Sequence, residues 1–246
     1  MSHPFLKNFQ PETFEVSAFG QGIESRKNQT ATGHHINGGE CTYTYNSLGF
    51  RGDAWPLAPE EKCFMTVGCS HTEGVGVNDD ETWPAYIAND IGLKHINFGW
   101  AGRSNDYIAR VISTFAPVIN PQFIIIMYTY PNRREYYREQ GPEPYITRPW
   151  GWFQENPEMW DSMTRLANPV EDMTNWYKNH MMIKQVLYEH NIPYIWNGTF
   201  LNDNTIHDRN RFDGNYEVED GFHATPEKNM ELSRRKVMYL KHFSYI

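Results

Sequence analysis

The chain has 246 residues and a mass of 28.9 kDa, near the upper end of what one hydrophobic core usually serves, so we expect a single domain over residues 1–246. Hydrophobic residues make up 39% of the chain and aromatic residues 15%, a composition that excludes a disordered protein. With 22 basic and 30 acidic residues the formal net charge is −8, which repels a phosphate backbone, so we expect neither a nucleic-acid partner nor binding to a membrane surface.

Three further classes of feature are missing from the sequence. The longest apolar run, residues 123–127, is far shorter than the ~20 residues that a membrane-spanning helix needs. Residues 1–12 lack a basic start followed by an apolar run, so we expect no signal peptide. Cys63 and Cys69 lie roughly 20 Å apart if they share an extended strand, which is too far for a disulfide. We therefore expect reduced thiols and a cytoplasmic location, with secretion as the open alternative.

The first part of the chain, residues 1–60, is rich in Gly, Asn, Thr and Pro and shows little periodicity, so we expect an irregular N-terminal arm. Strands and helices then alternate. We expect strands at residues 63–68, 95–98, 123–129 and 192–196, and helices at residues 83–91, 104–116, 171–190 and 226–240. This alternation predicts an α/β protein with a central parallel sheet that is covered by helices on both faces.

The expected helix boundaries rest on capping residues and prolines. Thr82 and Gly92 flank the first helix, and Ser104 can cap the second. Pro117 and Pro121 are expected to end that second helix, and Thr225 is expected to cap the last one.

A parallel sheet of this kind gathers its functional residues at the carboxyl ends of its strands. Ser70, Gly102 and Asn132 follow the first three expected strands, and Asp220 and His223 precede the last helix. A serine hydroxyl attacks where an imidazole accepts its proton and a carboxylate orients that imidazole, roles that Ser70, His223 and Asp220 can fill. The resulting oxyanion needs preorganised donors, for which the N–H groups of Ser70 and Gly102 and the amide of Asn132 are candidates. The pattern indicates acyl transfer.

These blocks, Gly68-Cys69-Ser70, the Gly102 turn, Asn132 and Asp220-x-x-His223, resemble in order and spacing the SGNH hydrolase superfamily, also called GDSL-like lipases and esterases. The resemblance covers roughly residues 45–130 and 190–240, including the segments 45–52 and 74–84. It implies a flavodoxin-like three-layer α/β/α fold with a catalytic triad and an oxyanion hole, and no metal or cofactor. Within it, the residues above take the roles of nucleophile (Ser70), base (His223), orienting acid (Asp220) and oxyanion hole (Ser70, Gly102 and Asn132).

The sequence departs from the family pattern at two places. Cys69 stands where the family usually has Asp, and the third block reads Tyr130-Pro131-Asn132-Arg133 in place of Gly-x-Asn-Asp. Two rival interpretations follow from these departures. One is a catalytically degenerate protein that keeps the fold and binds a glycan, and the other is catalysis by the Cys69 thiol. We interpret His71, the residue after the expected nucleophile, as a group that packs the loop.

The stretch after the third expected strand, residues 133–170, is expected as an insertion or lid. Seven aromatic side chains fall within residues 133–160, which suits either a wall that stacks on a substrate ring or a small separate core. Four arginines of this stretch are candidates for meeting an anionic group of the substrate: Arg133, Arg134, Arg138 and Arg148.

Together these observations predict a serine esterase that hydrolyses a short acyl ester of a carbohydrate or another polar alcohol through an acyl-enzyme. The mean hydropathy of −0.68 disfavours a long-chain lipid substrate. The oligomeric state is not predicted.

Overall fold

The computed structural model describes residues 26–53, 57–58, 61–137, 144–146, 168–198, 210–211 and 223–246. Its centre is a four-stranded parallel sheet formed by β3 (Cys63–Gly68), β4 (Lys94–Gly99), β5 (Ile124–Tyr128) and β8 (Tyr194–Gly198). The spatial order is β4-β3-β5-β8, so the strands, numbered along the chain within this sheet, run 2-1-3-4. This is the order of flavodoxin-like folds.

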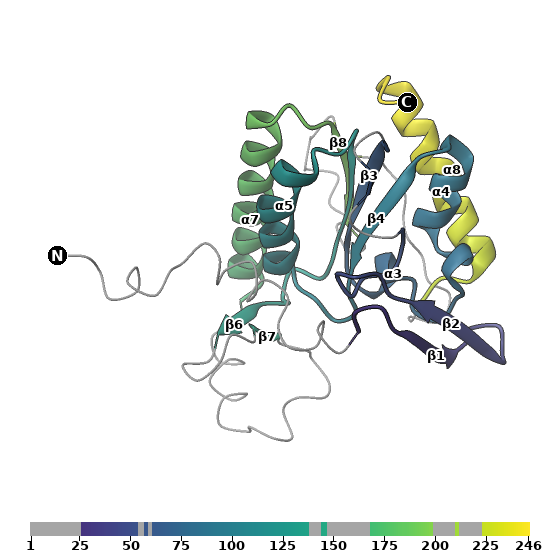
Figure 1. The fold of residues 1–246 in the computed structure, drawn as a ribbon. Helices are drawn as coiled ribbons and strands as arrows, with labels where there is room; N and C mark the ends of the chain where they lie inside the picture. The colour runs from purple at the N-terminus through teal and green to yellow at the C-terminus, as the bar shows by residue number, and fades with distance from the viewer. Residues whose placement is uncertain are drawn as a thin grey trace, which may run out of the picture.

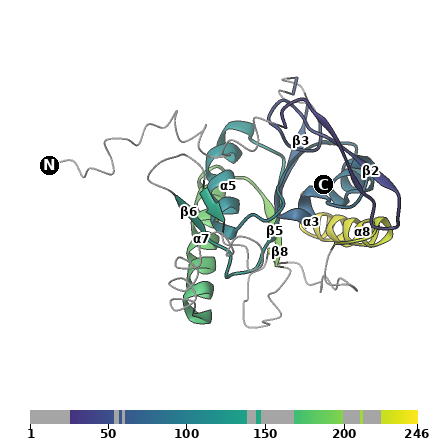
Figure 2. The ribbon, with the colours of Figure 1, turned by 90° about the horizontal axis from the view of Figure 1, so that it is seen from below.

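Helices form a layer on each side of the sheet, as Figures 1 and 2 show. One layer consists of α5 (Asn105–Ile119) and α7 (Pro169–Glu189), and the other of α4 (Trp83–Ile91) and α8 (Pro226–His242). The predicted three-layer α/β/α architecture is therefore confirmed. None of the helices in the described ranges is both long and apolar enough to cross a membrane.

The sheet is buried on both faces because its strands are apolar on both faces. In β3 the Phe64 side chain belongs to the cluster under α4 and α8, whereas Met65 and Val67 belong to the cluster under α5 and α7. Every residue of β3 is buried. Such continuous apolar strands are typical of parallel sheets that helices cover on both sides.

The helix caps agree with the sequence-based predictions, with one exception. Thr82, Ser104 and Thr225 each accept a hydrogen bond from a backbone N–H in the first turn of the helix that follows. The prediction that Pro117 ends the second helix is wrong, because α5 continues through Pro117 to Ile119. A proline so near the C-terminus removes one backbone bond of the last turn, and the left-handed Asn120 (φ 49°) ends the helix instead.

The N-terminal region differs from its prediction as well. Irregular backbone was expected throughout residues 1–60, and this is wrong for residues 30–44, where β1 (Thr30–His34) and β2 (Glu40–Thr44) form an antiparallel hairpin. Gly38 and Gly39 both have positive φ (95° and 86°) and make the reversal possible. A second hairpin, β6 (Glu135–Tyr137) with β7 (Pro144–Ile146), follows β5. Residues 1–25 lie outside the described residues.

Candidate active site

Ser70 is the first residue of α3 (Ser70–Glu73), a short helix that begins directly beyond the end of β3. Because β3 lies between β4 and β5, α3 starts where the strand order reverses. Open α/β sheets bind their ligands at this point, outside the carboxyl ends of the strands. Figure 1 shows α3 at the end of the sheet on which the two hairpins, β1–β2 and β6–β7, also lie.

Two glycines let α3 lie close against the strand ends. A Cβ atom at Gly68 would collide with the Thr72 side chain and stand 2.9 Å from the carbonyl oxygen of Met127. A Cβ atom at Gly99 would collide with the backbone of Thr72 and Glu73. The position of Ser70 therefore depends on the absence of side chains at the ends of both β3 and β4.

His223, which precedes the cap of α8, lies beside the residue that follows Ser70. The ring centres of His223 and His71 are 5.0 Å apart, with the two planes tilted by 47°. The structure thus brings the predicted base to the turn of the predicted nucleophile, whereas Asp220 lies outside the described residues. His71, interpreted from sequence as a loop-packing group, packs against His223. Burial, and to a smaller extent electrostatic interaction with His223 and Arg133, lowers the pKa of His71 to about 3.

Gly102 lies in the turn after β4, and a carboxylate ties this turn to α3. The backbone N–H of Ala101 donates to Glu73 Oε2 at 2.6 Å, while Glu73 Oε1 is paired with Arg26 at 2.9 Å. The Glu73 side chain is buried. Gly102 itself has a φ of 77°, a left-handed conformation that favours glycine. The sequence analysis did not single out Glu73.

Asn132 is exposed in the turn after β5, and this turn is joined to the one that carries Gly102. Asn105, the first residue of α5, accepts from Thr129 N–H and donates to Thr129 O, both at 3.0 Å. This pair of bonds links the loop after β4 with the loop after β5. Gly102 and Asn132, two of the three candidate oxyanion residues, thus lie on connected loops.

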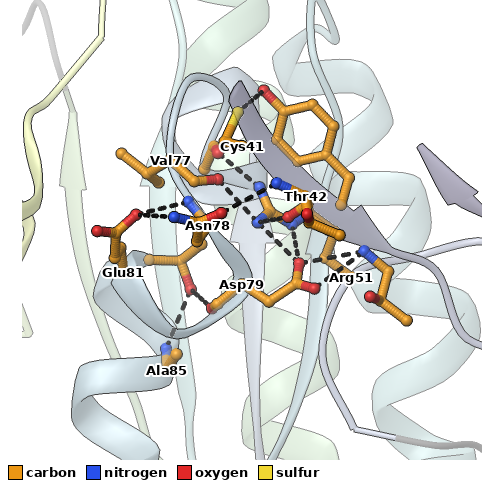
Figure 3. A network of polar contacts seen from close by, with 12 residues as sticks. Cys41, Thr42, Arg51, Val77, Asn78, Asp79, Glu81 and Ala85 are labelled. Carbon is orange, nitrogen blue, oxygen red and sulfur yellow. Dashed lines mark hydrogen bonds and ion pairs between the residues drawn. The ribbon is translucent and has the colours of Figure 1, made fainter. Parts of the chain in front are cut away.

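A buried arginine holds the chain that leaves α3 (Figure 3). The Arg51 guanidinium donates to the carbonyl oxygen of Val77 (3.0 Å) and to the carboxylate of Asp79 (2.8 Å), both labelled in Figure 3. It also donates to the carbonyl oxygens of Glu73 (3.1 Å) and Gly74 (2.5 Å). Thr42 O, on β2, is a further acceptor at 3.4 Å. Arg51 therefore joins segment 45–52 to segment 74–84. The resemblance had marked both segments, but their connection through a single guanidinium could not be read from the sequence.

Cys69 and Ser70 differ in exposure. Cys69 is 1% exposed, and Ser70 is partly exposed. All three cysteines of the chain, Cys41, Cys63 and Cys69, are buried free thiols. Among the described residues, no group of three or more His, Cys, Asp or Glu side chains could hold a metal ion.

A cavity of about 780 Å³ lies away from α3, between α4 and the loop after β2. Its lining includes Gly52, Asp53, Asp80, Lys94 and His95. Ser70, Gly102, Asn132 and His223 do not line it, so this cavity is not the candidate active site.

Comparisons with known proteins find relatives at the level of structure alone. No family model matches the chain, and no curated protein matches it. Among solved structures it is similar to an acetyl xylan esterase from the rumen bacterium Butyrivibrio proteoclasticus, with 13% identity, a TM-score of 0.47, and coverage of 79% of this chain and 66% of that one. It is also similar to the psychrotrophic esterase EstA from Pseudoalteromonas sp., with 9% identity, a TM-score of 0.40, and coverage of 76% and 100%.

A third similar structure is AlinE4, described as an SGNH-hydrolase family esterase, with 17% identity, a TM-score of 0.34, and coverage of 57% of this chain and 60% of that one. Likenesses at these identities and TM-scores assign no activity, so the function has to be inferred from the residues themselves.

Proposed function

We propose that the chain is a serine hydrolase that cleaves a carboxylic ester through Ser70, His223 and Asp220. The observation that carries this proposal is the position of Ser70 at the topological switch point, with the His223 ring 5.0 Å from the ring of the next residue. The burial of Cys69 supports the hydroxyl over the neighbouring thiol as the nucleophile.

In the proposed reaction, the Ser70 oxygen attacks the ester carbonyl carbon while His223 takes its proton, and Asp220 accepts a hydrogen bond from the imidazolium. The oxyanion of the tetrahedral intermediate accepts hydrogen bonds from the backbone of Ser70 and Gly102 and from Asn132. Collapse breaks the bond to the alcohol, which leaves with the proton from His223. Water then attacks the acyl carbon and gives a proton to His223. The bond between that carbon and the Ser70 oxygen breaks, Ser70 takes the proton back from His223, and the acid is released.

The state of His71 supports this cycle. Because burial holds its pKa near 3, His71 is neutral at neutral pH. His223 becomes positively charged in the transition state, and a second imidazolium 5 Å away would oppose that change. A neutral neighbour removes the opposition.

The substrate class follows from the polarity of the chain. We propose a short acyl group on a carbohydrate or another polar alcohol, since the mean hydropathy of −0.68 disfavours a surface that binds long-chain lipid. The exposed amide of Asn132 gives the site a polar rim.

Labelling with a fluorophosphonate tests the proposal. We expect one label per chain, located at Ser70 by mass spectrometry, and a loss of about 10³-fold or more in para-nitrophenyl acetate hydrolysis in Ser70→Ala. Ser113→Ala is the matched control, because the Ser113 hydroxyl donates to Ala109 O within α5 at 2.8 Å. An unlabelled protein that still binds acetylated sugars would instead be a glycan-binding protein. Activity that is lost in Cys69→Ala and kept in Ser70→Ala would identify a thiol nucleophile.

A further inference from the structure

The side chain of Arg133, the residue after Asn132, reaches across the end of the sheet. Its Nη1 lies 3.5 Å from the backbone oxygen of Arg103, in the loop after β4, and its Cζ lies 5.2 Å from the centre of the Tyr130 ring. Arg133 thus joins the loops that follow β5 and β4, the two strands that flank β3. Ser70 begins α3 directly beyond the end of β3.

The guanidinium of Arg133 has fewer interactions within the described ranges than its N–H groups could make. No carboxylate in the described part of the chain pairs with it, and its buried Nε has no hydrogen-bond partner there. A guanidinium carries five N–H donors. Other arginines of the structure have their anion within the protein, in the pairs Arg26–Glu73, Arg51–Asp79, Arg110–Glu135 and Arg134–Asp172.

This contrast separates the arginines that the sequence offered as candidates for binding an anionic group of the substrate. Arg134 donates to Asp172 at 3.0 Å and is held against the start of α7. Arg138 and Arg148 lie outside the described residues. Arg133 is the candidate that no described carboxylate pairs with and whose charge acts on His71, the residue after Ser70.

The described carboxylates around the loops after β4 and β5 bond to groups other than Arg133. Glu73 accepts from Arg26 and from Ala101 N–H. Asp106 accepts from two asparagines of α7 at 2.7 Å each and from the backbone N–H of Glu135. Glu135 accepts two hydrogen bonds from Arg110. Within the described ranges these carboxylates are thus already paired, and a carboxylate for Arg133 can be supplied by a ligand.

Arg133 also acts electrically on the candidate active site. Its charge contributes to the lowered pKa of His71, the residue after Ser70, and opposes the burial that raises the pKa of Tyr130. The chain as a whole carries a net charge of −8, so an anionic substrate needs a local cation to be held.

We propose that Arg133 binds a carboxylate that the ester substrate carries, on either its acyl or its alcohol part. This inference rests on the proposed function and names the class of ester that the same site takes. A planar guanidinium suits a carboxylate because two parallel N–H groups can meet its two oxygens.

Two matched ester pairs test the proposal and separate the two parts of the substrate. The acyl pair is the mono-para-nitrophenyl ester of glutarate with para-nitrophenyl valerate, and the alcohol pair is para-acetoxybenzoate with phenyl acetate. We expect Arg133→Gln to lower the ratio of kcat/KM for the anionic to the neutral ester about 10-fold or more in at least one pair. Arg235→Gln removes the same charge from the exposed face of α8 and should keep both ratios within about twofold. Unchanged ratios in Arg133→Gln for both pairs would overturn the proposal.

A binding measurement decides the same question without turnover. We expect isothermal titration of Ser70→Ala protein with monomethyl glutarate or para-acetoxybenzoate to show binding that is lost when Arg133→Gln is added. Equal heats with and without Arg133 would refute the subsite. Should hydrolysis survive Ser70→Ala in the kinetic experiment, the proposed nucleophile fails, while the titration still reports on Arg133.

Discussion

Replacement of Arg51 by lysine tests whether one guanidinium holds the loop behind the candidate nucleophile. The Arg51 side chain is 2% exposed and makes five hydrogen bonds to the carbonyls of Thr42, Glu73, Gly74 and Val77 and to Asp79. The buried acceptors are the carbonyls of Glu73, Gly74 and Val77, and they bond to two different guanidinium nitrogens, so the single ammonium nitrogen of Arg51→Lys leaves at least one of them without a donor. One unsatisfied buried acceptor costs ~1–3 kcal/mol, and this is the loss that we expect in the free energy of unfolding. Such a loss is a large part of the stability of a typical domain.

Urea unfolding followed by tryptophan fluorescence measures this loss. The control is Arg235→Lys, because Arg235 forms an exposed ion pair with Glu231 within α8 and its replacement should cost about 0.5 kcal/mol or less. A loss below about 1 kcal/mol in Arg51→Lys, with an unchanged denaturant slope, would show that other contacts hold segment 74–84 and would refute the reasoning.

Two further predictions concern the residues around Ser70. Glu73→Ala removes the hydrogen bond that holds the turn of Gly102, so we expect kcat for ester hydrolysis to fall about 10- to 100-fold with a smaller change in KM. Glu73→Gln keeps an acceptor for Ala101 N–H and should recover most of the lost kcat. Equal changes in kcat and KM would contradict this prediction. The pKa of His71 is about 3 in the folded protein, below its value in the unfolded chain. The folded state therefore binds fewer protons than the unfolded state, and the free energy of unfolding should fall as the pH drops below about 6.5 towards 3. The free energy of unfolding, measured with urea from pH 5 to pH 8, should rise with pH less steeply in His71→Gln than in the unchanged protein, by up to about 1.4 kcal/mol per pH unit. An identical pH dependence in the two proteins would exclude His71 as the cause.

The sequence predicted the layers of the fold because its signals there are local. Strands read as apolar runs, and the caps at Thr82, Ser104 and Thr225 precede periodic apolar stripes. The β1–β2 hairpin was missed because its strands are mostly exposed and polar, so they show no alternation of apolar residues. Its signal was the turn Asn37-Gly38-Gly39 between runs rich in Thr and Tyr.

In the candidate site, too, some residues could be proposed from local sequence signals and others only from the structure. Ser70, Gly102 and Asn132 could be proposed from the sequence because each follows a strand, and parallel topology brings strand ends together. Glu73, Asn105 and Arg51 act through bonds to backbone groups far along the chain, and nothing in the spacing of a sequence shows which backbone N–H or carbonyl a side chain will meet. The contact of His71 with His223 was missed for the same reason.

The presence of cysteine at position 69 becomes understandable from these supporting bonds. An acidic residue there would bring acceptors to the α3 turn, yet the backbone of this turn is already held by side chains from other elements. Trp83 donates to His71 O at 3.1 Å, Asn97 donates to Thr72 O at 2.8 Å, and Arg51 donates to Glu73 O at 3.1 Å. These donors come from α4, β4 and the loop after β2 and bond the carbonyl groups of the turn, while the N–H groups of Thr72 and Glu73 donate to Cys69 O. The turn is therefore bonded on both sides without a carboxylate at position 69, where a small buried thiol fills the space. The departure from the family pattern at Cys69 is thus compatible with a Ser70 that is held in place by its surroundings.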